Sequence, residues 1–87
     1  MFVILTYDVG EKRVNKVRKK LKKYLIWVQN SVFEGEITKG KLQQCLLELS
    51  RIINEKEDSI YIYEVNTPKF ITKNIIGQEK SLDDMFL

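Results

Sequence analysis

The chain of 87 residues contains no histidine, and this absence removes a large part of enzyme chemistry. Without histidine there is no Ser-His-Asp or Cys-His nucleophile arrangement, no histidine general base and no histidine-ligated metal site. The single cysteine, Cys45, can form neither an internal disulfide nor a paired-cysteine metal clip. Nothing in the cysteine content points to an oxidising compartment, so a cytoplasmic location is expected.

Proline and glycine are scarce, with one and four residues, and no long hydrophobic run is present. Hydrophobic residues make up 44% and charged residues 31% of the chain, which is typical of one globular domain. The longest stretch without a charge, residues 24–33, is too short and too polar for a membrane span. The apolar residues 1–5 are too few for a signal-peptide core. We therefore expect a soluble protein without membrane contact.

Positive charge is concentrated in one segment. Eight of the fifteen basic residues lie within residues 12–23, where there is no acid. At about 100° per residue, a helix here gathers its apolar side chains in one arc and leaves the remaining surface almost purely cationic. Like charges four positions apart, such as Lys12 and Lys16, mildly destabilise a helix. A solvated outer face is one interpretation, but this unfavourable pattern also indicates a surface that binds a polyanion.

Phosphate backbones are the obvious ligand for such a surface, and their binding would be sensitive to salt and largely blind to sequence. The candidate nucleic-acid-binding residues are Lys12, Arg13, Lys16, Arg18, Lys19, Lys20 and Lys23.

Four strands are predicted from the hydrophobic pattern. Residues 2–8 are apolar on both alternating faces, which indicates a central strand. Residues 26–29 and 31–37 are short β-prone runs separated only by Asn30, which predicts a tight hairpin or a bulged pair of strands. Residues 59–65 alternate isoleucine with tyrosine and form the last strand.

Two helices are predicted between these strands, over residues 11–25 and 38–56. Thr38 is the expected N-cap of the second helix, and its apolar period places Cys45 among core residues rather than as a nucleophile. The order β-α-β-β-α-β is that of the α+β ferredoxin-like fold, in which both helices cover one face of an antiparallel sheet and leave the other open. This architecture alone names no function.

The chain continues beyond this core. Residues 69–76 predict a fifth strand, so that the domain spans residues 1–77 and a tail covers residues 78–87. A frayed tail is one interpretation and a docking segment is the other. The docking interpretation depends on three large apolar residues at the end, Met85, Phe86 and Leu87.

Asp8 is the principal candidate for chemistry because it ends the predicted central strand just before Gly10. One interpretation is an N-cap or turn-forming aspartate for the following helix. The other is a ligand of Mg²⁺ or Mn²⁺, although one carboxylate binds such an ion weakly. In a two-fold dimer Asp8 occurs twice, and the pair could hold one metal on the axis that activates water or polarises a phosphodiester.

Four motifs together resemble a known family. They are Tyr7-Asp8-Val9, the Lys16-Val17 pair that leads to Leu21, the run VQNSVFEG over residues 28–35, and Asp58-Ser59-Ile60. The chain is similar, in order and over nearly its whole length, to the small CRISPR-associated protein two (Cas-two) family.

The resemblance implies a ferredoxin-like homodimer in which the open sheet faces meet and the C-terminal strand completes the partner's sheet. It implies a divalent-metal site from Asp8 of both subunits, with Asp8 as catalytic residue and Tyr7, Ser31 and Phe33 as active-site neighbours. The implied activity is phosphodiester hydrolysis on single-stranded RNA or double-stranded DNA. Many members carry arginine where this chain has Trp27.

The resemblance also implies a place in CRISPR spacer acquisition. There the dimer bridges two dimers of the Cas-one integrase along a DNA duplex, whose backbone is contacted without reading its sequence. Two alternatives are a stand-alone, toxin-like metal-dependent endonuclease and a regulatory module that uses neither metal nor nucleic acid.

Overall fold

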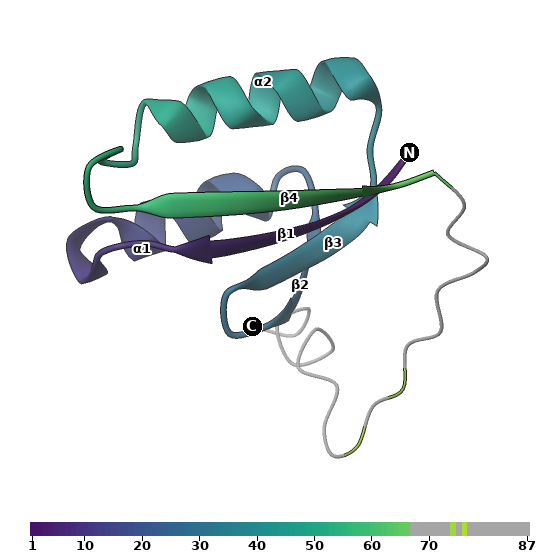
Figure 1. The fold of residues 1–87 in the computed structure, drawn as a ribbon, viewed down its shortest axis with the longest axis horizontal. Coiled ribbons are helices and arrows are strands. Elements are labelled where there is room, and N and C mark those ends of the chain that lie inside the picture. Colours follow the sequence, from purple (N-terminus) through teal and green to yellow (C-terminus); the bar gives the residue numbers. More distant parts are fainter. Residues whose placement is uncertain (67–73, 75, 77–87) are drawn as a thin grey trace.

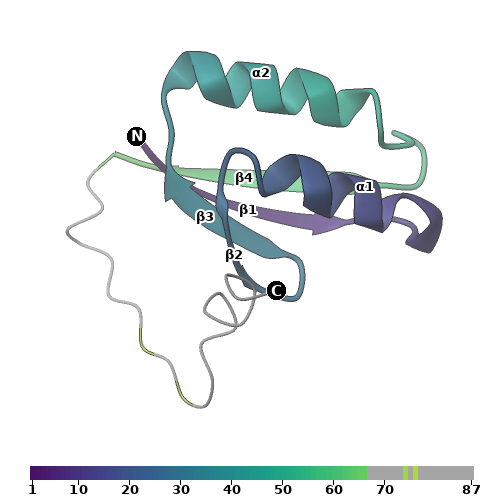
Figure 2. The ribbon, with the colours of Figure 1, turned by 180° about the vertical axis from the view of Figure 1, so that it is seen from behind.

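The computed structural model describes residues 1–66 together with Asn74 and Ile76. The elements, in chain order, are β1 (Phe2–Asp8), α1 (Glu11–Leu21), β2 (Ile26–Gln29), β3 (Val32–Glu36), α2 (Lys39–Ser50) and β4 (Ser59–Val65). The sheet is antiparallel with strand order β2-β3-β1-β4, and both helices lie on the same face of it (Figure 1, Figure 2). The predicted α+β ferredoxin-like order is therefore confirmed.

Strand β1 is central because it pairs with β3 on one side and with β4 on the other. Its side chains alternate between two environments. Val3, Leu5 and Tyr7 are buried beneath the helices, whereas Ile4 and Thr6 on the opposite face are half-buried. The strand is thus apolar on both faces, as predicted, and the helices cover one of these faces.

Two local predictions are confirmed. Asn30 adopts a left-handed backbone with φ of 38°, a conformation that asparagine tolerates better than most residues, and it turns β2 into β3. Thr38 is the N-cap of α2, where its side-chain oxygen accepts a hydrogen bond from the Lys41 backbone N–H at 3.2 Å.

Helix α1 ends four residues earlier than predicted. The Lys23 and Tyr24 amides donate to the Lys20 and Leu21 carbonyls, so the chain tightens into i→i+3 bonds after Leu21. Leu25, expected as the last helical residue, is nonetheless buried. The tightened turn directs it into the core immediately before β2.

Helix α2 ends at Ser50 rather than near Lys56. The apolar period that predicted the longer helix continues through Ile52 and Ile53, which still pack against the core from a turn. The chain then reverses because the Asn54 carbonyl accepts hydrogen bonds from the Glu57 and Asp58 amides. Apolar spacing alone could not distinguish a last helical turn from this turn.

The core lies between the sheet and the helices, and Cys45 belongs to it as predicted. Cys45 is fully buried, and burial raises the pKa of its thiol to about 11. A thiol that stays protonated at neutral pH is a poor nucleophile, so Cys45 serves as a small core residue.

Apart from Asn74 and Ile76, the predicted fifth strand over residues 69–76 lies outside the described residues, as do the boundary at residue 77 and the tail over residues 78–87. Among the residues that the structure does describe, neither helix has the length and apolar character needed to cross a membrane.

Candidate functional site

Asp8 is the last residue of β1 and is exposed. It pairs with Ser59 of β4, and the alternation of β1 places it on the same face as Ile4 and Thr6, away from the helices. Within the described part of the chain, its carboxylate makes no hydrogen bond or ion pair with another residue. Asp8 is therefore exposed and without a partner among the described residues, which makes it the candidate ligand-binding carboxylate of this site.

The alternative role of Asp8 as a cap is not observed. Gly10 is the N-cap of α1, and no side chain supplies a cap hydrogen bond there. The Gly10 amide instead donates to Oδ1 of Asp58 at 2.9 Å. A carboxylate 48 residues away along the chain thus binds the backbone at the start of α1, where local sequence suggested that Asp8 would act.

Asp58 is the centre of a buried polar cluster that sequence reasoning missed. Its side chain is fully buried and accepts hydrogen bonds from Arg13 Nε at 2.6 Å and Arg13 Nη2 at 2.9 Å. It also accepts the Asn54 amide at 2.8 Å, besides that of Gly10. The Arg13 hydrogen bonds hold the pKa of the Asp58 carboxyl well below its usual range, while the same contact raises the pKa of the Arg13 guanidinium.

Asp58 is expected to make stability depend on pH. Because its folded pKa is lowered, its contribution is fully present above the unfolded pKa of about 4 and is lost as pH falls toward the folded value. Asp58→Asn should therefore melt several degrees below the wild type at pH 7, and this gap should narrow below pH 4. Thermal denaturation of both proteins from pH 7 to pH 2 measures it. A gap that stays constant over this range would show that the Asp58 charge is not responsible.

The predicted cationic surface is present along α1, but two of its seven residues form ion pairs with acidic side chains. Arg13 contacts Asp58 and also bonds Oε2 of Glu57 at 3.0 Å, and Lys20 lies 3.4 Å from Oε1 of Glu48. Five residues remain exposed along α1 and the turn that follows it, and we call them the α1 basic surface: Lys12, Lys16, Arg18, Lys19 and Lys23.

The three predicted neighbours of Asp8 lie close to one another, but two of them face the core. Tyr7 and Phe33 are buried on the helix side of the sheet, with ring centroids 6.2 Å apart. The Tyr7 amide donates to the Ser31 carbonyl at 3.1 Å, and Nε of Arg18 donates to the Tyr7 hydroxyl at 3.3 Å. In one chain, therefore, the rings of Tyr7 and Phe33 support the end of β1 from the face opposite the Asp8 side chain.

Trp27 occupies a structural position. It is half-buried against the core, and its indole N–H donates to the Asn30 carbonyl at 3.0 Å. Trp27 therefore stabilises the β2–β3 hairpin and cannot replace a guanidinium that contacts phosphate.

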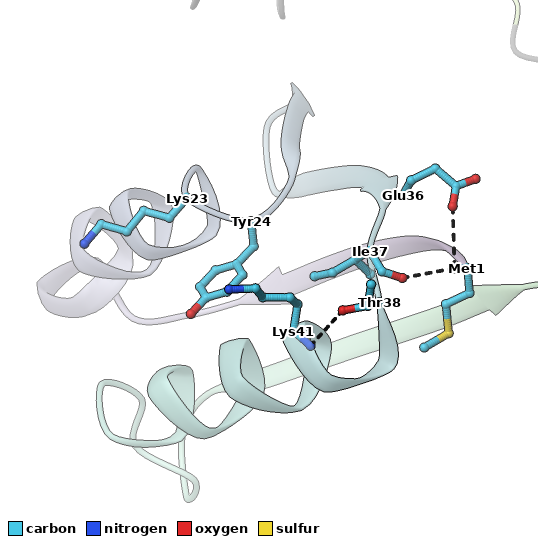
Figure 3. A pocket seen from close by; sticks show the side chains of 7 residues that line it. All are labelled: Met1, Lys23, Tyr24, Glu36, Ile37, Thr38 and Lys41. Atoms are coloured by element: carbon cyan, nitrogen blue, oxygen red, sulfur yellow. Dashed lines mark hydrogen bonds and ion pairs between the residues drawn. The ribbon is translucent and has the colours of Figure 1, made fainter.

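A cavity of about 450 Å³ lies at the other end of β1, where the chain passes from β3 into α2 (Figure 3). Lys23, Tyr24 and Lys41 are among the residues that line it, and Asp8 is not. Met1 also lines this cavity and lies just before β1, whereas Asp8 lies at the other end of that strand. The cavity is therefore separate from the candidate site.

A metal site is incomplete within one chain. No group of three or more Asp, Glu, His or Cys side chains able to hold a metal occurs among the described residues. Mg²⁺ prefers six oxygens and often uses one or two carboxylates together with waters and substrate phosphate oxygens. The exposed Asp8 carboxylate is an oxygen ligand of the type that this ion prefers.

Comparison with known proteins points to one family. The family model for CRISPR associated protein Cas2 matches residues 1–72. A protein from Thermodesulfovibrio yellowstonii named CRISPR-associated endoribonuclease Cas2 3 is 54% identical over 93% of this chain and 92% of its own length. CRISPR-associated endoribonuclease Cas2 from Thermotoga maritima is 51% identical over 95% of each chain.

Solved structures give the same result. A crystal structure described as that of cas2 has a TM-score of 0.82 and 47% identity, covering 93% of this chain and 91% of its own. Streptococcus pyogenes Cas2 at pH 6.5 has a TM-score of 0.73 and 35% identity, covering 85% of this chain and 99% of its own.

Proposed function

Because the chain belongs to the CRISPR associated protein Cas2 family, we propose that it is a dimeric CRISPR adaptation subunit that binds nucleic acid without sequence preference and hydrolyses phosphodiester bonds with a divalent metal. The observation that carries the catalytic part is the state of Asp8, which is exposed, lies at the end of the central strand and has no partner within the described residues. The relatives' name of endoribonuclease supports hydrolysis of RNA.

The open face of the sheet is the surface through which two copies pair. One row of directly opposed residues crosses all four strands: Ile26, Glu34, Ile4 and Tyr63. Ile26 and Tyr63 are 61% and 57% exposed, an unusual state for large apolar side chains on a sheet. Covering this face with the same face of a second copy removes that apolar area from water. It also accounts for a first strand that is apolar on both faces.

In the dimer the Asp8 carboxylates would be the residues that hold Mg²⁺ or Mn²⁺. When bound, this ion supplies positive charge that stabilises the charge developing on the phosphodiester. The α1 basic surface binds the phosphate backbone and restrains the nucleic acid. The chain has no histidine, so no imidazole serves as general base.

The adaptation role follows from the same surfaces. Phosphate contacts by lysine and arginine position a duplex without reading bases, which suits a subunit that bridges two dimers of the Cas-one integrase along DNA. The predicted fifth strand and the tail over residues 78–87 would extend the dimer and dock the integrase. A stand-alone, toxin-like endonuclease is the second candidate, favoured by the relatives' name of endoribonuclease.

Metal removal tests the catalytic proposal. Labelled single-stranded RNA and duplex DNA are incubated with the wild type in Mg²⁺, in Mn²⁺ and in excess EDTA. Cleavage of at least one substrate is expected in either metal and should fall to background in EDTA, because a single uncompensated carboxylate per chain cannot stabilise the phosphate charge. Cleavage that persists in EDTA would contradict a metal-dependent mechanism.

The adaptation role has a separate test. The wild type, purified Cas-one integrase and a short duplex are mixed and analysed by size exclusion with light scattering. A complex containing one dimer of this protein and two integrase dimers is expected. Nuclease activity without any such complex would favour the stand-alone endonuclease.

A further inference from the structure

We propose that Asp58 and Arg13 act as positioning residues for Asp8, holding the end of β1 in the geometry that metal binding requires. This inference rests on the proposed function of Asp8. We call Asp58, Arg13, Gly10 and Asn54 the Asp58 latch.

The latch holds Asp8 from two directions. On the C-terminal side, the Gly10 amide, two residues beyond Asp8, donates to Asp58 Oδ1 at 2.9 Å. Across the sheet, Asp8 pairs with Ser59, the residue that follows Asp58. Asp8 is therefore connected to the buried Asp58 carboxylate in two ways, along the chain through Gly10 and across the sheet through Ser59. Any displacement of Asp58 would move both supports together.

Arg13 and Asn54 fix Asp58 in turn. Arg13 lies in the first turn of α1 and makes two hydrogen bonds to Asp58, at 2.6 Å and 2.9 Å. The Asn54 amide donates from the loop after α2 at 2.8 Å. The carboxylate thus joins the start of α1, the loop after α2 and the beginning of β4. A bidentate contact between the half-buried Arg13 guanidinium and the buried Asp58 carboxylate fixes the relative orientation of the two groups more sharply than a single hydrogen bond.

Gly10 allows this arrangement. A Cβ atom at Gly10 would lie only 2.5 Å from Nη2 of Arg13 and 3.6 Å from Oδ1 of Asp58. The guanidinium therefore packs directly over the backbone of the loop that follows Asp8. A residue with a side chain at this position would displace Arg13 and loosen the latch.

Precise support matters at Asp8 because each copy supplies only one carboxylate to the ion. When a site has only a small number of protein ligands, its metal affinity depends strongly on the position of each ligand. Mutation of the residues that hold a ligand in place commonly changes metal affinity by about 10–100-fold. The latch is at the end of β1, where a strand would otherwise fray into the Val9-Gly10 loop. The contacts of Asp58 with Arg13 and Gly10 join residues 45 and 48 positions apart in the chain, so the folded domain itself creates the rigid support.

The test compares Asp58→Asn and Arg13→Gln with two controls. Glu57→Gln removes only the exposed outer partner of Arg13, and Leu49→Ala destabilises the core away from the latch. For each dimer we measure Mn²⁺ binding by electron paramagnetic resonance without substrate, and the Mn²⁺ concentration for half-maximal cleavage. The second quantity is independent of the fraction of folded protein, so a purely structural defect does not change it.

Both latch variants are expected to need about tenfold more Mn²⁺, with unchanged KM for RNA and with activity recovered at high Mn²⁺. Glu57→Gln and Leu49→Ala should bind Mn²⁺ as the wild type does. Wild-type Mn²⁺ affinity in both latch variants would overturn the proposal. If Asp58→Asn does not fold, the Mn²⁺ affinity of Arg13→Gln alone decides the test. In that variant the Gly10 amide should also exchange its hydrogen faster than in the wild type.

The outcome separates this inference from the proposed function. If Asp8→Asn binds Mn²⁺ as tightly as the wild type, the metal site is not at Asp8 and the proposed function itself fails. If Asp8→Asn loses binding while both latch variants keep it, only the positioning role fails.

Discussion

Replacing Asp8 by asparagine is expected to lower metal-dependent cleavage at least a hundredfold without lowering the stability of the fold. Asparagine keeps the shape of the side chain but removes the charge that attracts the cation. Loss of the metal's stabilisation of transition-state charge, several kcal/mol, corresponds to a hundredfold or more because each 1.4 kcal/mol is tenfold in rate. Stability should be unchanged because Asp8 is exposed and its carboxylate has no partner among the described residues.

The comparison requires equal folding and a matched control. Glu55→Gln neutralises another exposed carboxylate, in the loop between α2 and β4, and should cleave like the wild type. Cleavage rates at saturating Mg²⁺, melting temperatures and dimer masses are measured for all three proteins. An Asp8→Asn variant that cleaves within threefold of the wild type would exclude Asp8 as a catalytic residue.

Mixed dimers sharpen this result. If both copies of Asp8 are needed, a dimer with one Asp8→Asn subunit is as defective as one with two. Random exchange of equal amounts leaves about a quarter of the dimers fully wild type, so activity should fall to about a quarter rather than a half. A value of a half would indicate that each subunit acts alone.

Duplex binding is expected to weaken about 500-fold when salt rises from 50 to 200 mM. The α1 basic surface offers five exposed cations, Lys12, Lys16, Arg18, Lys19 and Lys23. If each neutralises one phosphate, the slope of log affinity against log salt is about −4.5 for one protomer, and steeper when both protomers engage. Fluorescence anisotropy with duplexes of unrelated sequence measures both the slope and the expected indifference to sequence.

Neutral variants identify the residues responsible. Lys16→Gln combined with Lys19→Gln should make the slope shallower by about 2. Lys56→Gln, an exposed lysine in the loop after α2, should leave it unchanged. A slope near zero, or a strong preference for one sequence, would mean that phosphate contacts by α1 do not drive binding.

Most of the fold could be predicted because its signals are local. The alternation of β1, the turn at Asn30 and the Thr38 cap each depend on a few neighbouring residues. The helix ends were predicted too far along because apolar spacing continues past both of them. A side chain such as Leu25 can reach the core from a tightened turn as well as from a helix.

The candidate site was predicted only in part. Asp8 was proposed from its position at the end of a strand, and the α1 basic surface from its charge. The buried role of Asp58 was missed, although an aspartate directly before a strand and an arginine near the start of a helix are visible in the sequence. No local pattern indicates that Arg13 pairs with a residue 45 positions away instead of contacting phosphate.

The sequence by itself determined the order of the elements, the absence of histidine and cysteine chemistry, and the concentration of positive charge on α1. These properties depend on composition and short-range periodicity, which the chain carries whether or not it is folded. Only the tertiary structure decided which charged side chains form ion pairs within the fold and which are exposed. Folding brings Asp58 against Arg13 and Gly10 and leaves Asp8 exposed, because ion pairing and burial depend on distance in space rather than along the chain.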